Sequence, residues 1–151
     1  MMTFEELNAA LEIRRAIEME KSRLEDLKLC AVSVGGSQLD GMPKAKPQTS
    51  KTEKLTVKIM ESEERLQQLQ AELAEASGLL AERLSNELNG SSLMLSVMLR
   101  RYVAGLSCTA IARQLNFTLG YVQKVHLRGV LRLTGNRPPE FHKPHQRRRS
   151  C

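Results

Sequence analysis

Residues 107–128 read SCTAIARQLNFTLGYVQKVHLR, and this stretch decides how the rest of the chain is interpreted. Asn116 separates its two apolar clusters, and asparagine tolerates left-handed backbone better than most other non-glycine residues. Thr118 follows where its hydroxyl can cap the start of a second helix. The stretch therefore predicts two short helices around a tight turn.

The same residues satisfy the packing requirements of a helix-turn-helix motif. Such a motif needs a small side chain where its helices cross, and Ala112 provides it. Apolar side chains must surround that point, and the candidates are Ile111, Leu115, Phe117, Val122 and Val125. We therefore expect a DNA-binding helix-turn-helix whose recognition helix, residues 118–132, enters the major groove of duplex DNA.

If Val122 and Val125 face the core, other residues of the recognition helix face the DNA. Those expected toward the groove are Thr118, Leu119, Gly120, Gln123, Lys124 and His126. Gln123 suits an adenine edge, and Lys124 suits a guanine or a phosphate. Arg113, Arg128 and Arg132 are candidates for phosphate contacts, although the latter two also fit a solvated helix face; Tyr121 fits either the core edge or a phosphate. The predicted DNA-binding residues are Arg113, Thr118, Gly120, Tyr121, Gln123, Lys124, Arg128 and Arg132.

The charges divide the 151-residue chain into an acidic part and a basic part. Residues 1–90 hold 12 Lys and Arg against 16 Asp and Glu, whereas residues 91–151 hold 11 against the single Glu140. The net charge of +6 is therefore the remainder of −4 and +10. A basic part of this kind favours a polyanionic partner such as DNA, the alternative being that it only aids solubility.

The acidic part predicts two long helices. Apolar residues recur at three- and four-residue steps over residues 3–30, where Glu20 interrupts the stripe, and again from Lys51 to Leu88, where Ser62 does so. Thr3 followed by acidic residues favours a helix start. Residues 33–50 contain three glycines and two prolines and predict a loop. The simplest arrangement is an antiparallel, coiled-coil-like hairpin, which either forms a homodimer or packs only on its own C-terminal domain.

These observations predict an all-α protein with three parts. The first is the helical hairpin, residues 3–89 with its loop at 33–50. The second is the helix-turn-helix domain, residues 91–134, in which a helix from Leu93 to Ala104 comes first and ends at Gly105. The third is a basic, proline-containing tail, residues 135–151, which we expect to be disordered.

The C-terminal residues carry a family resemblance. The string LRRYVAGLS at residues 99–107, with Ile111-Ala112, Tyr121-Val122 and HLRGVLRL at 126–133, resembles the region-4 helix-turn-helix of bacterial sigma factors, which reads the −35 promoter element. Residues 3–133 are similar to small phage and prophage proteins related to the RinA and ArpU late transcription regulators, which begin with a helical hairpin. Gly41-Met42-Pro43 matches a stretch often found in the loop of that hairpin.

The resemblance implies a transcription regulator of phage or prophage type in the cytoplasm of a bacterial host, with host RNA polymerase as a further partner. The chain departs from the sigma pattern at two places. Cys108-Thr109-Ala110 stands where acidic residues are common, and Gly120 lowers helix propensity in the recognition helix.

Other classes of function find less support. Three widely spaced cysteines favour a reducing compartment, and no apolar run is long enough to predict a membrane span. We expect no enzyme, no catalytic residue, no metal site and no cofactor, because no phosphate-binding loop, metal-ligand spacing or nucleophile–base pair is visible. Two alternatives stay open: a DNA-packaging recognition subunit resembling the small terminase subunits, and a helical adaptor that binds only protein.

Overall fold

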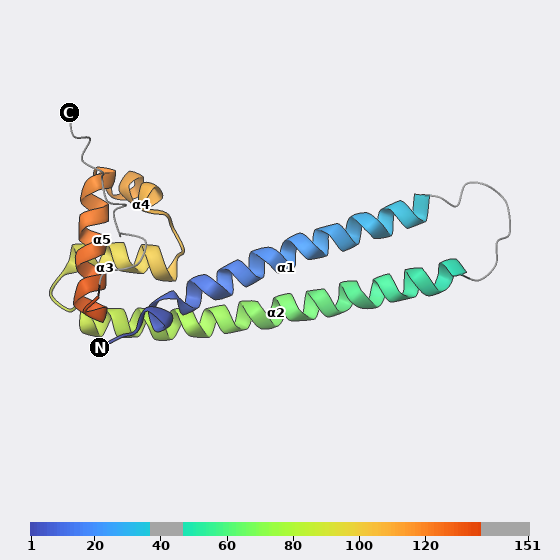
Figure 1. The fold of residues 1–151 in the computed structure, drawn as a ribbon, viewed down its shortest axis with the longest axis horizontal. Helices are drawn as coiled ribbons and strands as arrows, with labels where there is room; N and C mark the ends of the chain where they lie inside the picture. The colour runs from blue at the N-terminus through green and yellow to red at the C-terminus, as the bar shows by residue number, and fades with distance from the viewer. Residues whose placement is uncertain (37–46, 137–151) are drawn as a thin grey trace, which may run out of the picture. The chain divides into compact units, whose positions relative to one another are not determined.

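A computed structural model describes residues 1–36 and 47–136 of the chain (Figure 1). All regular secondary structure in this part is helical, which confirms the predicted all-α class. The elements are α1 (Phe4–Gly36), α2 (Pro47–Glu87), α3 (Ser92–Met98), the π-helical segment η1 (Leu99–Val103), α4 (Cys108–Leu115) and α5 (Leu119–Thr134). None of the described helices is long and apolar enough to cross a membrane. Residues 41–43 and the predicted tail from residue 137 onward lie outside the described residues.

Helix α1 begins at a reciprocal cap. The backbone N–H of Glu6 donates to Thr3 Oγ1 at 3.2 Å, and the Glu6 carboxylate accepts from the backbone N–H of Thr3 at 2.8 Å. This backbone bond, reinforced by the hydrogen bond from Arg83, holds the pKa of Glu6 below its ordinary value. The predicted helix start at Thr3 is confirmed.

The connection between the long helices differs from the predicted loop at 33–50. Helix α1 continues to Gly36, and α2 begins at Pro47. Proline suits the first position of a helix, where its missing N–H has no partner to lose. The glycines near the end of α1 lower helix propensity by only about 1 kcal/mol each, which does not stop a helix that is already formed.

The contacts divide the chain into two compact units, which we describe separately. One unit is Glu12–Glu75, and the other combines Met1–Leu11 with the chain from Ala76 onward. These units do not follow the change in composition near Asn89-Gly90. The first residues of α1 and the last residues of α2 therefore belong to the same unit as the basic helices.

Within Glu12–Glu75, the helices α1 and α2 lie side by side in opposite directions (Figure 1). Ile17 and Leu24 of α1 are buried there. Glu20 and Ser62, the residues that interrupt the two apolar stripes, are also buried, and Ser62 Oγ donates to Glu20 Oε1 at 2.7 Å. The two polar interruptions of the apolar stripes therefore lie opposite each other and form a hydrogen bond, so neither is buried without a partner.

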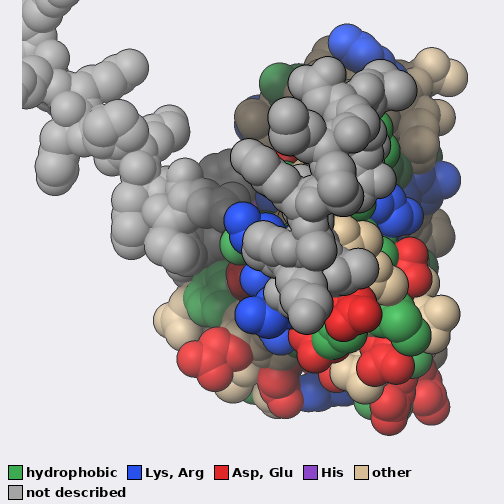
Figure 2. All heavy atoms as spheres, turned by 90° about the vertical axis from the view of Figure 1, so that its right-hand side faces the viewer, with side chains coloured by type: hydrophobic (Ala, Val, Ile, Leu, Met, Phe, Trp, Pro, Cys, Tyr) green, Lys and Arg blue, Asp and Glu red, His purple; other side chains and the backbone are tan. Residues whose placement is uncertain are grey.

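The acidic side chains of the long helices are mostly at the surface. Figure 2 shows Asp and Glu side chains on the outside of the molecule, with Lys and Arg side chains beside them. All Asp and Glu residues in the described part of the chain lie before residue 91, since residues 91–136 contain none. Among the described Asp and Glu residues, Glu20 is the buried one, since only 8% of it is exposed.

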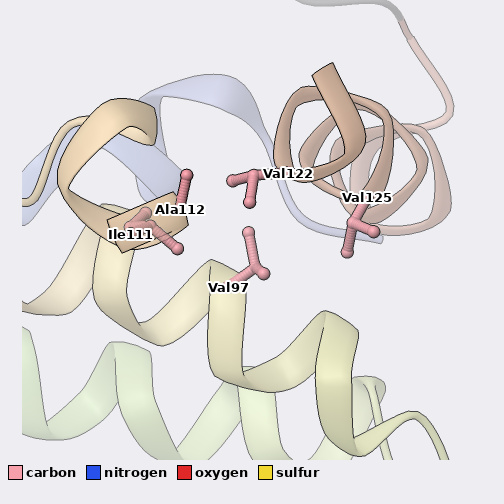
Figure 3. Packing of buried hydrophobic residues seen from close by; sticks show 5 residues of the cluster. All are labelled: Val97, Ile111, Ala112, Val122 and Val125. Atoms are coloured by element: carbon pink, nitrogen blue, oxygen red, sulfur yellow. The ribbon is translucent and has the colours of Figure 1, made fainter. Parts of the chain in front are cut away.

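In the other unit, α3 and α4 both pack on α5. The side chains at the centre of this packing point toward one another (Figure 3) and are Val97, Ile111, Ala112, Val122 and Val125. Gly129 allows α3 and α5 to approach closely, because a Cβ atom at this position would lie 2.7 Å from Met98 Sδ. The backbone N–H of Met2 donates to the carbonyl of Leu133 at 3.0 Å, which ties the start of the chain to α5.

The predicted helix from Leu93 to Ala104 is not a regular α-helix throughout. Its second half is η1, in which the N–H of Ala104 reaches back five residues to the carbonyl of Leu99 at 3.0 Å. Arg100 within η1 donates through Nε to Gln114 Oε1 on α4 at 3.1 Å and also bonds Ser96. The wider turn thus coincides with side-chain bonds to another helix, and such long-range bonds leave no signal in local sequence.

Candidate nucleic-acid interface

Local hydrogen bonds at the caps and the turn hold the segment from α4 to α5. Ser107 Oγ caps α4 by accepting from the N–H of Ala110 at 3.2 Å. Asn116 adopts left-handed backbone, with φ 56° and ψ 40°, and its N–H bonds the carbonyl of Ala112. Thr118 Oγ1 then caps α5 by accepting from the N–H of Tyr121 at 3.3 Å. The predicted turn at Asn116 and the predicted cap at Thr118 are confirmed.

Most residues expected to close the two helices together are buried. Ile111, Ala112, Val122 and Val125 lie in the core, and Leu115 packs against them. Phe117 is different, because 42% of it is exposed and its ring lies 5.1 Å from the ring of Tyr121. The prediction that Phe117 packs inward is therefore wrong.

The position of Phe117 follows from the shape of the turn. The left-handed Asn116 reverses the chain at once, and the N–H of Phe117 bonds back to the carbonyl of Ala112 at 3.0 Å. Phe117 is thus placed between the two helices, just before the cap of α5. Its ring finds an exposed aromatic partner one turn ahead in place of a core position.

A face of α5 opposite the buried valines is open. Gly120, Lys124 and Arg128 follow one another at four-residue steps along it, and Gln123 lies beside them. No atom lies within 4 Å of the place that a Cβ on Gly120 would occupy. All eight predicted DNA-binding residues are exposed, namely Arg113, Thr118, Gly120, Tyr121, Gln123, Lys124, Arg128 and Arg132.

Residues 91–136 carry six Lys and Arg and no Asp or Glu. Arg100 and Arg101 are engaged internally, the latter donating to the carbonyl of Leu106 at 3.2 Å. For Arg113, Lys124 and Arg128, the described part of the chain supplies no hydrogen bond and no ion pair. These three charges are therefore available to an external anion.

Arg132 has an internal partner that the sequence did not indicate. Its Nη1 donates to Ser91 Oγ at 3.1 Å, from α5 to the residue that precedes α3. Beside it lies an open hollow of about 340 Å³. The lining includes Ser91, Ser92, Met94, Tyr121, Val125 and Arg128. Ser91 and Ser92 thus adjoin the exposed face of α5.

His126 does not face the groove side of α5, which corrects the sequence-based expectation. It is buried, and its Nε2 lies 2.8 Å from Tyr102 Oη. Burial, followed by the nearby charge of Arg101, lowers the pKa of His126 to about 4. Its burial could have been predicted from helical spacing. His126 lies four residues from both Val122 and Val130, which are buried, and therefore shares their face of the helix.

Comparison with known proteins adds no further information about this site. No protein-family model, curated protein or solved structure matches the chain. Among the described residues, no three His, Cys, Asp or Glu side chains gather closely enough to hold a metal ion. The arrangement is therefore interpreted from its own geometry and charge.

Proposed function

We propose that this protein is a sequence-specific, duplex-DNA-binding transcription regulator of phage or prophage type. The observation that carries the proposal is the exposed face of α5, where Lys124 and Arg128 lie in line with Gly120 and have no hydrogen-bond or ion-pair partner among the described residues. A surface rich in cations and free of carboxylates favours a polyanion. Its location on a capped helix that follows a tight turn favours the major groove of DNA.

In this proposal, α4, the turn at Asn116 and α5 form a helix-turn-helix, with residues 118–132 as the recognition helix. The buried Val122 and Val125 fix which face of α5 is turned outward. Gln123 is then positioned to bond an adenine edge, and Lys124 a guanine or a phosphate. Arg113 on α4 and Arg128 on α5 contact phosphates on either side.

Arg132 joins the proposed interface only if a phosphate displaces its internal partner, Ser91. Its bond to Ser91 Oγ is made by a neutral hydroxyl at the surface, so a phosphate can compete for the guanidinium. Tyr121 lies beside Arg128 along the same hollow, where its hydroxyl can donate to a phosphate. Both residues therefore belong to the positioning contacts and not to the base contacts.

The long helices α1 and α2 form, in this proposal, an antiparallel hairpin that holds two copies of the chain together. Between residues 12 and 75, the described helices leave Met19, Val57 and Met60 exposed at 52–74%. These side chains are the apolar surface that a second hairpin would cover. Sedimentation at micromolar concentration tests this part, and a monomer there contradicts it. Host RNA polymerase remains a proposed further partner.

The decisive experiment is salt-titrated binding to duplex DNA that the protein itself selects from a random pool. Gln123→Ala/Lys124→Ala should weaken specific binding by about tenfold or more without unfolding the protein. A matched control is Gln70→Ala/Lys54→Ala, which removes the same two side-chain types from exposed positions on α2. The affinity of the wild type should fall by orders of magnitude between roughly 50 and 200 mM salt if several phosphates are contacted.

Three results would contradict the proposal. Failure of the wild type to bind any duplex would favour the alternative hypothesis of a helical adaptor that binds only protein. Equal binding by the Gln123/Lys124 variant and the wild type would show that α5 is not the recognition helix. A ring of about eight or more copies would favour a DNA-packaging subunit over a regulator.

A further inference from the structure

Leu119, the first residue of α5, is a large apolar side chain that lies at the surface. Its exposed fraction is 41%, although leucine is among the residues most often buried. Phe117 and Tyr121 are exposed to similar extents, 42% and 43%. Three large side chains within five residues are thus exposed around the start of α5.

The contact between Phe117 and Tyr121 explains part of their exposure at the surface. No such contact explains the exposure of Leu119. The rings of Phe117 and Tyr121 lie 5.1 Å apart at an angle of 50° and shield one another. Leu119 precedes Tyr121 by two residues, which places the two side chains about 200° apart around the helix. Leu119 instead shares an edge of α5 with Gln123, one turn further along.

The surroundings of Leu119 indicate what kind of group it contacts. Its neighbours in the chain are Thr118 and Gly120, and the next residue on the same edge of α5 is the polar Gln123. An interface with another protein needs a contiguous apolar patch of several hundred Å². Residues 91–136 carry six Lys and Arg and no carboxylate, which suits nucleic acid.

We propose that Leu119 contacts the 5-methyl group of a thymine in the major groove, beside the base that Gln123 reads. This inference rests on the proposed function, because it assumes that the first turn of α5 reaches base edges. The thymine methyl is the apolar group that the major groove offers, and apolar side chains recognise it by contact. With Gln123 suited to adenine, this edge of α5 is selective for neighbouring A·T pairs.

The test separates the methyl contact from DNA binding as such. The full-length wild type first selects its preferred duplex from a random pool. Each thymine of that duplex is then replaced singly by deoxyuridine, which removes only the methyl group. Binding of the wild type should weaken about fourfold at one thymine, or at its symmetry-related copy, because one buried methyl contributes about that much. Leu119→Ala should lose a similar factor on the thymine duplex and become indifferent to uracil at that position.

The control is Leu29→Ala, which removes an exposed leucine from α1 and should keep the uracil penalty of the wild type. Circular dichroism checks that Leu119→Ala remains folded, as expected for an exposed helix position. If the wild type binds its selected duplex but no uracil substitution matters, the thymine contact is overturned while DNA binding stands. A uracil penalty that persists in Leu119→Ala overturns it equally. Full affinity of that variant for the thymine duplex also overturns it. If no duplex is selected, both the inference and the proposed function fail.

Discussion

Ser62 Oγ on α2 donates a hydrogen bond of 2.7 Å to Glu20 Oε1 on α1, and both residues are buried. Arg65 lies close to the same carboxylate, with its Nε 3.7 Å from Glu20 Oε2. A buried carboxylate needs such partners, because its desolvation is otherwise uncompensated. The contact also distinguishes one alignment of the two helices from its neighbours, since a slip of one helical turn would bring Glu20 toward Ile59 or Leu66.

Removing the hydroxyl should therefore destabilise the protein more than its size suggests. We expect Ser62→Ala to lower the free energy of unfolding by about 1–3 kcal/mol, measured by urea denaturation. Replacing both polar residues, as in Glu20→Leu/Ser62→Leu, should restore or exceed the stability of the wild type. Ser22→Ala, at an exposed position on α1, is the control and should change stability by less than about 0.5 kcal/mol. A Ser62→Ala variant as stable as the wild type would refute the importance of this bond.

Gly120 and Gly78 form a matched pair that separates helix stability from recognition. Both are helical, exposed and surrounded by open space, so an alanine fits at either position. Gly78→Ala, in the interior of α2, should stabilise the protein by roughly 0.5–1 kcal/mol, and Gly120→Ala, in the first turn of α5, should stabilise it by less; both are seen as a higher melting temperature. Only Gly120→Ala should weaken binding to the selected duplex, because a methyl on that face obstructs close approach of the DNA. Equal DNA affinity of the two variants would show that the DNA does not approach α5 at Gly120.

The stability of the protein should depend on pH through His126. Its pKa is about 4 in the folded protein, against an ordinary value of 6.5, so the unfolded chain binds the proton more readily. The stabilisation is complete above pH 6.5 and is lost as the pH falls toward 4, by about 3 kcal/mol in total. Denaturation curves measured at several pH values check this. His126→Gln, which does not titrate, should be less sensitive over the same range, and an identical slope in this variant would exclude His126 as the cause.

Ala112 tests the packing between α4 and α5. It is buried in the cluster that also contains Ile111, Val122 and Val125. Ala112→Leu should destabilise the protein by about 1–3 kcal/mol through overpacking and should weaken DNA binding in parallel. The control is Ala104→Leu at an exposed position, for which urea denaturation should show little change. A fully stable Ala112→Leu variant would mean that the two helices do not cross at this residue.

The parts of the fold that short-range chemistry determines were predicted well. Thr3 and Thr118 cap their helices, and Asn116 adopts left-handed backbone, because each depends on hydrogen bonds within a few residues. The buried positions Val122 and Val125 followed from helical periodicity. Most of the candidate interface could be predicted in the same way. Once periodicity has assigned the buried residues of α5, the remaining residues of that helix must face outward.

The missed features depend on residues far apart in the chain. Arg132 donates a hydrogen bond to Ser91. The π-helical turn η1 contains Arg100, which donates to Gln114 on α4. Local periodicity contains no information about such pairs. The pairing of Glu20 with Ser62 is intermediate: each interruption was visible, but only the alignment of the two helices shows that they meet.

The hydrogen bond from the N–H of Met2 to the carbonyl of Leu133 has a consequence for synthesis. Met2, Leu7 and Ala10 are buried in the same compact unit as α5, and they leave the ribosome well before α5 does. At ordinary elongation rates, on the order of ten seconds passes between the two. The apolar residues of the first helical turns must stay unaggregated during that interval. A fragment that begins after residue 90 would for the same reason lack part of its own core.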